Sequence, residues 1–117
     1  MRAIKDVDIS QSLLLLSTKN RYSAKRDTNM LIFRTDGDNF ILAASSECGR
    51  FKPDWYLNLK EEPIVEVQVN GESFYANATT PTGKERLRLW PLMDEISNIS
   101  RVVIPRNTAM VVLNRID

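Results

Sequence analysis

The sequence feature that most constrains the fold is a pair of alternating segments joined by Asn-Gly. Ile64 to Val69 (IVEVQV) places three valines on one face, and this two-residue period predicts a strand with one buried face. Asn70-Gly71 follows, and this dipeptide favours the tight turn of a β-hairpin. Glu72 to Thr79 (ESFYANAT) alternates again, with a phenylalanine and two alanines on one side. The sequence therefore predicts a β-hairpin over residues 64–79.

Further short strand patterns lie on both sides of this hairpin. The run SLLLLST is apolar and bounded by polar residues, which predicts a strand buried on both faces. An Asp-Gly dipeptide within Thr35 to Asp38 predicts a second hairpin. The strands expected outside residues 64–79 are Ser12 to Thr18, Asn29 to Arg34, Asn39 to Ser45, Arg101 to Ile104 and Thr108 to Leu113. Closing six or seven short strands into a small barrel is an economical way to remove their exposed edges.

Two helices are expected between these strands. Pro53 suits the first turn of a helix that continues to Lys60, and Pro63 stops it after about two turns. Thr82 followed by Glu85 predicts a capping box at the start of a second helix. Its apolar stripe, interpreted as core, consists of Leu89, Trp90, Met93 and Ile96. Pro91 within that helix predicts a kink or a break.

Composition limits the class of protein. A chain of 117 residues fits one domain, here residues 1–117 with residues 1–11 as an N-terminal arm. Histidine is absent and Cys48 is the only cysteine, which disfavours triad catalysis, an internal disulfide and a zinc site, so no metal is expected. A net charge of +1, short apolar runs and no signal-peptide pattern predict a cytoplasmic protein with neither a nucleic-acid nor a membrane partner. Any enzyme of this composition would rely on a bound cofactor.

Two segments carry candidate binding residues. Lys19 to Asp27 (KNRYSAKRD) is rich in basic side chains. It fits either a solvated hairpin loop or an anion cradle, in which three cations and a serine hydroxyl would hold a phosphate or carboxylate. Lys52 to Pro63 (KPDWYLNLKEEP) contains one of the two tryptophans, Trp55. Trp55 fits either a lid over the barrel end or a wall of a pocket for a planar ligand.

The segment Pro53 to Val69 also carries a family resemblance. It reads PDWYLNLKEEPIVEVQV and matches the pattern P-x-W-Y-x-N-L-x-x-x-P-x-V-x-V-Q at every fixed position. Ala43 to Ser45, Glu85 to Pro91 and Val111 to Leu113 add support. The chain resembles the deazaflavin-dependent nitroreductase family, which is related to the pyridoxamine phosphate oxidase-like flavin-binding fold. The resemblance implies a mainly β, α+β fold: a split β-barrel of six or seven mostly antiparallel strands with two or three short helices.

The resemblance also implies a function and a binding site. A deazaflavin coenzyme of the F-420 type would lie in a groove and pass a hydride to an electron-poor substrate. Ser45 and Ser46 would face the polar edge of the ring, and Trp55 would close over the groove. The acidic tail of the coenzyme would meet Arg21, Ser23, Lys25, Arg26 and Lys52, and Asn29 completes the predicted cofactor-binding set. No catalytic residue is assigned, and Tyr56 and Asn58 are expected to hold the helix to the barrel.

Several loop residues depart from the family pattern. Asn20 and Ala24 replace glycines, Asp27 replaces an arginine, Met30 replaces a proline, and Ser46 stands where a lysine is frequent. A carboxylate facing a phosphate would repel it. Three readings therefore stay open: a deazaflavin-dependent reductase, an FMN-binding protein, and a barrel without redox chemistry that serves as a binding module. A homodimer is compatible with this fold class.

Overall fold

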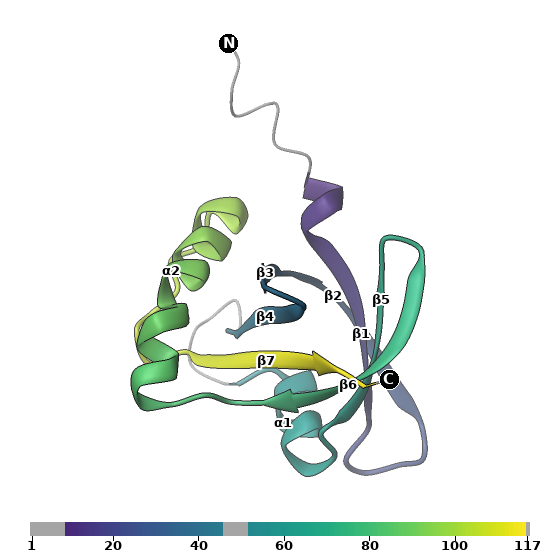
Figure 1. Ribbon diagram of the computed structural model, residues 1–117. Coiled ribbons are helices and arrows are strands. Elements are labelled where there is room, and N and C mark those ends of the chain that lie inside the picture. The colour runs from purple at the N-terminus through teal and green to yellow at the C-terminus, as the bar shows by residue number, and fades with distance from the viewer. Residues whose placement is uncertain (1–8, 46–51, 117) are drawn as a thin grey trace.

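Seven antiparallel strands form one sheet that curls into a barrel. The computed structural model describes residues 9–45 and 52–116 (Figure 1). The strands are β1 (Leu13–Lys19), β2 (Arg26–Ile32), β3 (Arg34–Asp36), β4 (Asn39–Ala44), β5 (Ile64–Val69), β6 (Glu72–Thr79) and β7 (Ala109–Arg115). The helices are the 3-10 helix η2 (Ile9–Ser12), α1 (Asp54–Glu61) and α2 (Gly83–Ser100). The order of the strands in the sheet is β2-β1-β5-β6-β7-β4-β3. The predicted mainly β, α+β split barrel is therefore confirmed.

The two edge strands of this sheet are consecutive in the chain. Only Phe33 separates β2 from β3, while β2 pairs with β1 and β3 pairs with β4. The backbone N–H of Phe33 donates to the carbonyl of Ser12 at 2.8 Å, and its ring is buried. The chain therefore passes from one side of the barrel to the other at Phe33. The expected single strand Asn29 to Arg34 is wrong at this point, because it spans two strands with different partners.

Alternation divides the barrel strands into an inner and an outer face. In β1, Leu14 and Leu16 are buried whereas Leu13 and Leu15 are only partly covered. The prediction of a strand buried on both faces is therefore wrong. The physical reason is that α2 packs over β2, β3 and β4, so that no helix among residues 9–45 and 52–116 covers the outer face of β1. The hairpin predicted over residues 64–79 is confirmed, with Asn70 and Gly71 at φ 52° and 81°.

Of the kink or break expected at Pro91, a break does not occur, because helix α2 runs continuously from Gly83 to Ser100. Pro91 is exposed, and the carbonyl left without its helical donor belongs to Leu87, whose side chain is 64% exposed. Water can satisfy a carbonyl on that side of a helix. The apolar stripe is confirmed as core, because it packs with Ile41, Met110 and Val112 of the sheet.

The predicted capping box is also wrong. Thr82 is the N-cap residue but makes no side-chain hydrogen bond there. Glu85 instead accepts from Arg88 at 2.7 Å, and Arg88 also contacts Asp36 on β3 at 2.9 Å. The hydrogen bond from Arg88 is the main cause that lowers the pKa of Asp36, and likewise that of Glu85. Arg88 thus joins α2 to the edge strand of the barrel.

This ion pair predicts a pH effect on stability. Carboxylates whose folded pKa is lowered stabilise the protein above their unfolded pKa of about 4, and this contribution is lost as the pH falls through the folded pKa. Arg88→Gln should therefore make the melting temperature fall less between about pH 5 and pH 3 than in the unsubstituted protein. Lys84→Gln is the control, since Lys84 on the same helix pairs with no carboxylate among the described residues. Parallel acid profiles for Arg88→Gln and the unsubstituted protein would contradict the prediction.

The segment after α2 is not the strand that was expected over Arg101 to Ile104. Arg101 adopts a left-handed conformation at φ 60° and ends the helix. The backbone of Val102 is satisfied by side chains: Ser97 Oγ donates to its carbonyl at 2.7 Å, and its N–H donates to Ser100 Oγ at 3.2 Å. This turn takes the place of a strand ladder, and the chain returns along α2 to β7 (Figure 1).

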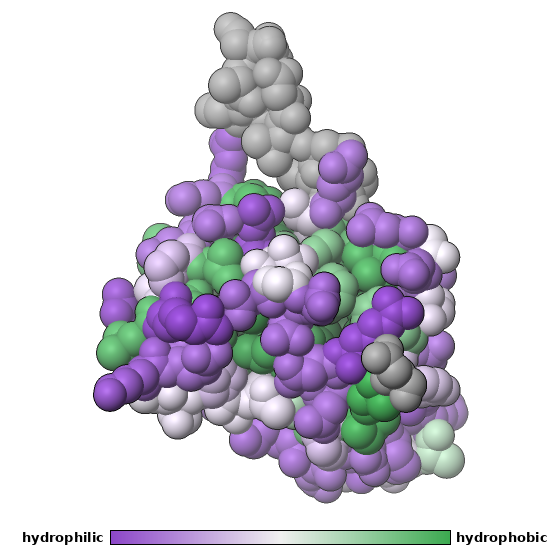
Figure 2. Space-filling model, viewed as in Figure 1, coloured by the Kyte–Doolittle hydropathy of each residue, from purple (hydrophilic) through white to green (hydrophobic). Residues whose placement is uncertain are grey.

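The surface is mixed in character. Hydrophobic residues appear as separate areas among hydrophilic ones on the face shown in Figure 2.

Within residues 9–45 and 52–116, no helix combines the length and the hydropathy that a membrane-crossing helix requires.

Candidate functional site

An apolar cleft lies where the barrel is split. It measures about 240 Å³ and is formed by β2, the end of β4, the last turns of α2 and the segment that follows α2. Its described lining is Met30, Leu31, Ile32, Ala43, Ser45, Ile96, Ser100, Val102 and Ile104. None of these side chains titrates, and the two serine hydroxyls are the polar groups among them. Apolar walls with a few polar groups suit a planar, largely apolar ring.

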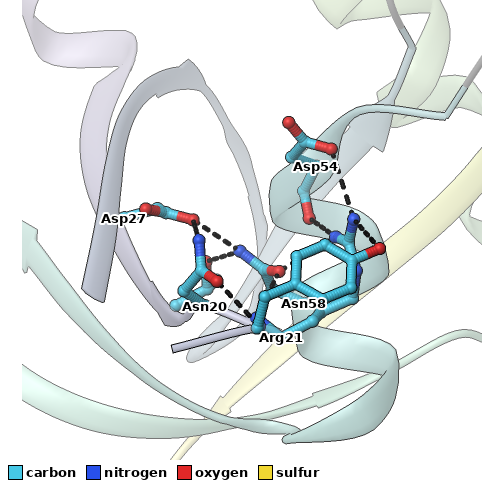
Figure 3. Close-up of polar contacts among 7 residues, drawn as sticks. Asn20, Arg21, Asp27, Asp54 and Asn58 are labelled. Atoms are coloured by element: carbon cyan, nitrogen blue, oxygen red, sulfur yellow. Dashed lines mark hydrogen bonds and ion pairs between the residues drawn. The ribbon is translucent and has the colours of Figure 1, made fainter. Parts of the chain in front are cut away.

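A second, polar arrangement lies at the opposite end of β2, around Asn58 of α1. Asn58 is only 1% exposed. Its Oδ1 accepts from the backbone N–H of Arg21 at 3.2 Å and from Arg21 Nη1 at 2.9 Å. Its Nδ2 donates to Thr18 Oγ1 and to Asp27 Oδ2, both at 3.0 Å (Figure 3). The amide is fully used, and it ties α1 to β1, to β2 and to the loop between them. This is the structural role expected for Asn58.

Arg21 is held against α1. Its Nη1 donates to the backbone carbonyl of Asp54 at 3.0 Å, in addition to Asn58, and its Nη2 contacts the Tyr22 hydroxyl at 3.4 Å and the Asp54 carboxylate at 3.5 Å. The hydrogen bond to Tyr22 is the largest cause of a raised pKa of Arg21, followed among the raising effects by Asp54. The guanidinium is charged and its side chain is only 13% exposed. Its hydrogen-bonding capacity is therefore largely spent inside the protein.

Asp27 belongs to the same network. Its Oδ2 accepts from Asn20 Nδ2 and Asn58 Nδ2, each at 3.0 Å (Figure 3). The two residues that depart from the family pattern at positions 20 and 27 are thus hydrogen-bonded to each other. The loop is stabilised from within by amides that meet a carboxylate, a charge-assisted arrangement.

The other predicted loop residues lie at the surface. Ser23 Oγ accepts from the backbone N–H of Lys25 at 3.2 Å. Arg26 donates from Nε to Ser17 Oγ at 3.0 Å and from Nη2 to the Ser17 carbonyl at 2.8 Å. Ser23, Lys25 and Arg26 are all exposed. Arg26 is directed along the outer face of β1, away from the Asn58 network.

The remaining predicted residues are distributed over three places. Trp55 is 4% exposed and packs in the barrel core, edge-to-face with Tyr56. The Trp55 ring thus packs with the barrel core. Lys52 is exposed, with its Nζ 5.4 Å from the centre of the Tyr56 ring. Asn29 is exposed on β2 beside the cleft residue Met30, and Ser46 lies outside the described residues.

The structure does not gather the predicted set into one contact group. Ser45 lines the cleft, whereas Arg21, Ser23 and Lys25 belong to the loop between β1 and β2, and Arg26 is the first residue of β2. The sequence interpretation missed the cleft wall formed by Ser100, Val102 and Ile104, because that segment resembled a strand. An apolar stretch directly after a helix that ends in serines was the available signal. Among the described residues, no three His, Cys, Asp or Glu side chains gather as a metal site.

Comparison with known proteins identifies the family. Residues 5–112 match the family described as F420H(2)-dependent quinone reductase. The putative F420H(2)-dependent quinone reductase Rv3178 of Mycobacterium tuberculosis is 35% identical over 78 residues, which are 67% of this chain and 66% of that protein. The F420H(2)-dependent quinone reductase Rv1261c of the same species is 36% identical over 86 residues, 72% of this chain and 57% of that protein. The aligned part thus spans less than two thirds of each relative.

Solved structures agree on the fold. The F420-H2 dependent reductase FDR-A superposes with a TM-score of 0.74 at 22% identity, covering 89% of this chain and 95% of that one. A putative pyridoxamine 5'-phosphate oxidase from Listeria innocua gives a TM-score of 0.63 at 12% identity, covering 91% and 85%. The resemblance to deazaflavin-dependent split-barrel proteins is confirmed. Since the family match covers most of the sequence, the chain belongs to the F420H(2)-dependent quinone reductase family.

Proposed function

We propose that this protein is a deazaflavin-dependent oxidoreductase that transfers a hydride from the reduced F-420 type coenzyme to a quinone. The observation that carries the proposal is the apolar cleft at the split of the barrel in a chain of this family. The cleft accepts a planar ring, and the coenzyme would supply the hydride. The relatives carry the same reaction in their names.

The residues of the chain would mainly bind and orient. Ile32, Ala43 and Ile96 exclude water from the faces of a ring, and Ser45 offers a hydroxyl to its polar edge. The described lining contains no acid or base, so the protein's contribution is positioning rather than proton transfer at a titrating side chain. Hydride transfer tolerates a lining without a titrating side chain, because the reaction needs orientation and one proton for the product.

The direct test mixes the purified protein with the reduced coenzyme and a water-soluble naphthoquinone. We expect protein-dependent oxidation of the coenzyme, followed by the return of the fluorescence of its oxidised ring. Titration with FMN in parallel tests the alternative cofactor. Binding of FMN alone would replace the proposal by the FMN reading, and binding of neither would leave the barrel as a module without redox chemistry.

We further infer that the protein is a homodimer and that it works in the cytoplasm. The outer face of β1 and β2 supports a dimer, because no helix of the described part of the chain covers Leu13 and Leu15 and because Met30 is 64% exposed. A hollow of about 310 Å³ lies on this face beside the turn at Asn70 and Gly71. A structural neighbour with a TM-score of 0.75 and 22% identity is described as a domain-swapped dimer. Light scattering after size exclusion measures the mass, and a monomer at micromolar concentration would contradict the dimer.

A further inference from the structure

Two arginines lie against one buried tryptophan near the start of α2. Trp90 is 6% exposed, and the centre of its ring lies 4.9 Å from Arg86 Cζ and 4.8 Å from Arg106 Cζ. Arg86 Nη2 also donates a hydrogen bond to the backbone carbonyl of Arg106. Arg106 is exposed and Arg86 is partly exposed, so a ligand in solution can reach both guanidiniums. The cation–π contacts with the indole help to hold the two positive charges beside each other.

Neither guanidinium has a carboxylate partner within residues 9–45 and 52–116. Two acidic residues of α2 are already engaged there, because Glu85 pairs with Arg88 and Glu95 pairs with Arg34. Asp94, one turn beyond Trp90, forms no ion pair with either arginine in the same part of the chain. The arginines that do form ion pairs in the described structure are Arg21, Arg34, Arg88 and Arg115. The charges of the pair on Trp90 are therefore not cancelled by a contact with an acid of the described chain.

Most hydrogen-bond donors of the two side chains are also free among the described residues. The Arg106 guanidinium donates no hydrogen bond there, and Arg86 donates only to the Arg106 carbonyl. A guanidinium has five N–H donors in a planar fork that fits the oxygens of a phosphate or a carboxylate. Neighbouring like charges repel each other, and an anion that contacts both would offset this repulsion.

We propose that Arg86 and Arg106 form a binding site for an anion with two oxyanion groups, such as a diphosphate or a dicarboxylate. Each guanidinium takes one of these groups in charge-assisted hydrogen bonds, which are stronger than hydrogen bonds between neutral groups. The site does not depend on the proposed function, because the cleft lining contains neither arginine.

Two sources offer an anion of this chemistry. One is a free anion, and the other is the acidic tail of a coenzyme whose ring lies in the cleft. The cleft residue Ile104 precedes Arg106 by two residues, which is at most about 7 Å of extended chain. The experiments below distinguish the two sources.

The first experiment titrates the protein with inorganic pyrophosphate at low salt and follows the two indole N–H signals by NMR. Trp90→Phe lacks one signal and so assigns them. We expect the Trp90 signal to shift with a dissociation constant below about 1 mM. The Trp55 signal should stay in place, because Trp55 packs in a different hydrophobic cluster.

A charge-removing variant tests whether the binding is local. Arg106→Gln should weaken pyrophosphate by at least about fivefold. It should fold, since the Arg106 guanidinium donates no described hydrogen bond, and melting curves check this. Arg101→Gln is the matched control: it removes one exposed charge at the other end of α2, about 22 Å along the helix from Arg86. Equal losses in both variants would contradict the site, because they would show diffuse attraction by net charge.

The second experiment titrates the complete coenzyme and the tail-free deazaflavin chromophore by fluorescence quenching. If the tail is the anion, Arg106→Gln weakens the complete coenzyme by at least about fivefold and leaves the tail-free ligand unchanged. If the anion is free, only pyrophosphate binding responds to the substitution. The inference is overturned when Arg106→Gln changes neither. Pyrophosphate binding without any binding of a deazaflavin would contradict the proposed function and leave the anion site intact.

Discussion

Replacing Asn58 by alanine should lower the free energy of unfolding by about 3 kcal/mol and the melting temperature by roughly 10 °C. The reason is that Asn58 is 1% exposed and its amide makes four hydrogen bonds. Alanine would leave the buried Thr18 hydroxyl without this donor, would remove one of the two amide donors of the Asp27 carboxylate, and would remove an acceptor from Arg21. Buried groups left without partners cost more than the hydrogen bond itself contributes.

A second substitution distinguishes lost hydrogen bonds from a lost volume. Asn58→Leu restores most of the side-chain volume but none of the hydrogen bonds, so it should be about as destabilising as Asn58→Ala. Asn98→Ala is the control, since Asn98 is exposed on α2 and should change the melting temperature by less than roughly 2 °C. Thermal and urea unfolding measure the three variants. Near-native stability of Asn58→Leu would show that packing alone, and no polar network, holds α1 in place.

The strands of this protein could be predicted because one-sided burial leaves a clear pattern. Residues 64–79 alternate in sequence and in the structure, and the Asn-Gly turn fixes their register. The prediction failed for β1, where four leucines in a row hide the alternation. The outer leucines are apolar although no helix within the described residues covers them, so hydropathy alone could not tell the two faces apart.

The side-chain contacts at the start of α2 and the path of the chain after it could not be predicted, because tertiary partners decide them. Glu85 has the spacing of a capping box, yet Arg88 offers it a charged donor that also reaches Asp36 on β3. A pairing 52 residues away in the sequence is invisible to a local pattern. After the helix, Val102 to Ile104 have strand-like composition, but they pair with no strand of the described sheet.

The candidate site could be predicted only in part, because tertiary contacts also decide which of its residues are available. The basic residues of Lys19 to Asp27 were found from composition, and the structure places them in the loop between β1 and β2 and at the strand ends that flank it. Their availability depends on contacts with α1, more than thirty residues away, which commit Arg21 and orient Asp27. The cleft combines residues from β2, β4 and the chain after α2, and only the closure of the barrel brings these segments together.

A substitution in the cleft is expected to have the largest effect on binding of the deazaflavin. Val102 lines the cleft and is 48% exposed, so its side chain reaches both the cavity and its mouth. A tryptophan there should fill the space that a ring would occupy while straining the core little, since half of the side chain faces solvent. We expect Val102→Trp to weaken binding of the deazaflavin by at least about thirtyfold, which is roughly 2 kcal/mol.

The adjacent valine provides the matched control. Val103 is 84% exposed and is absent from the cleft lining, so Val103→Trp adds the same ring on the same segment but outside the cavity. Fluorescence titration should give Val103→Trp a dissociation constant within about threefold of the unsubstituted protein. Equal losses in both variants would show that the segment after α2 was disturbed as a whole. Unchanged binding in Val102→Trp would remove the ring from this cleft, because a filled cavity and a bound ring cannot share the same volume.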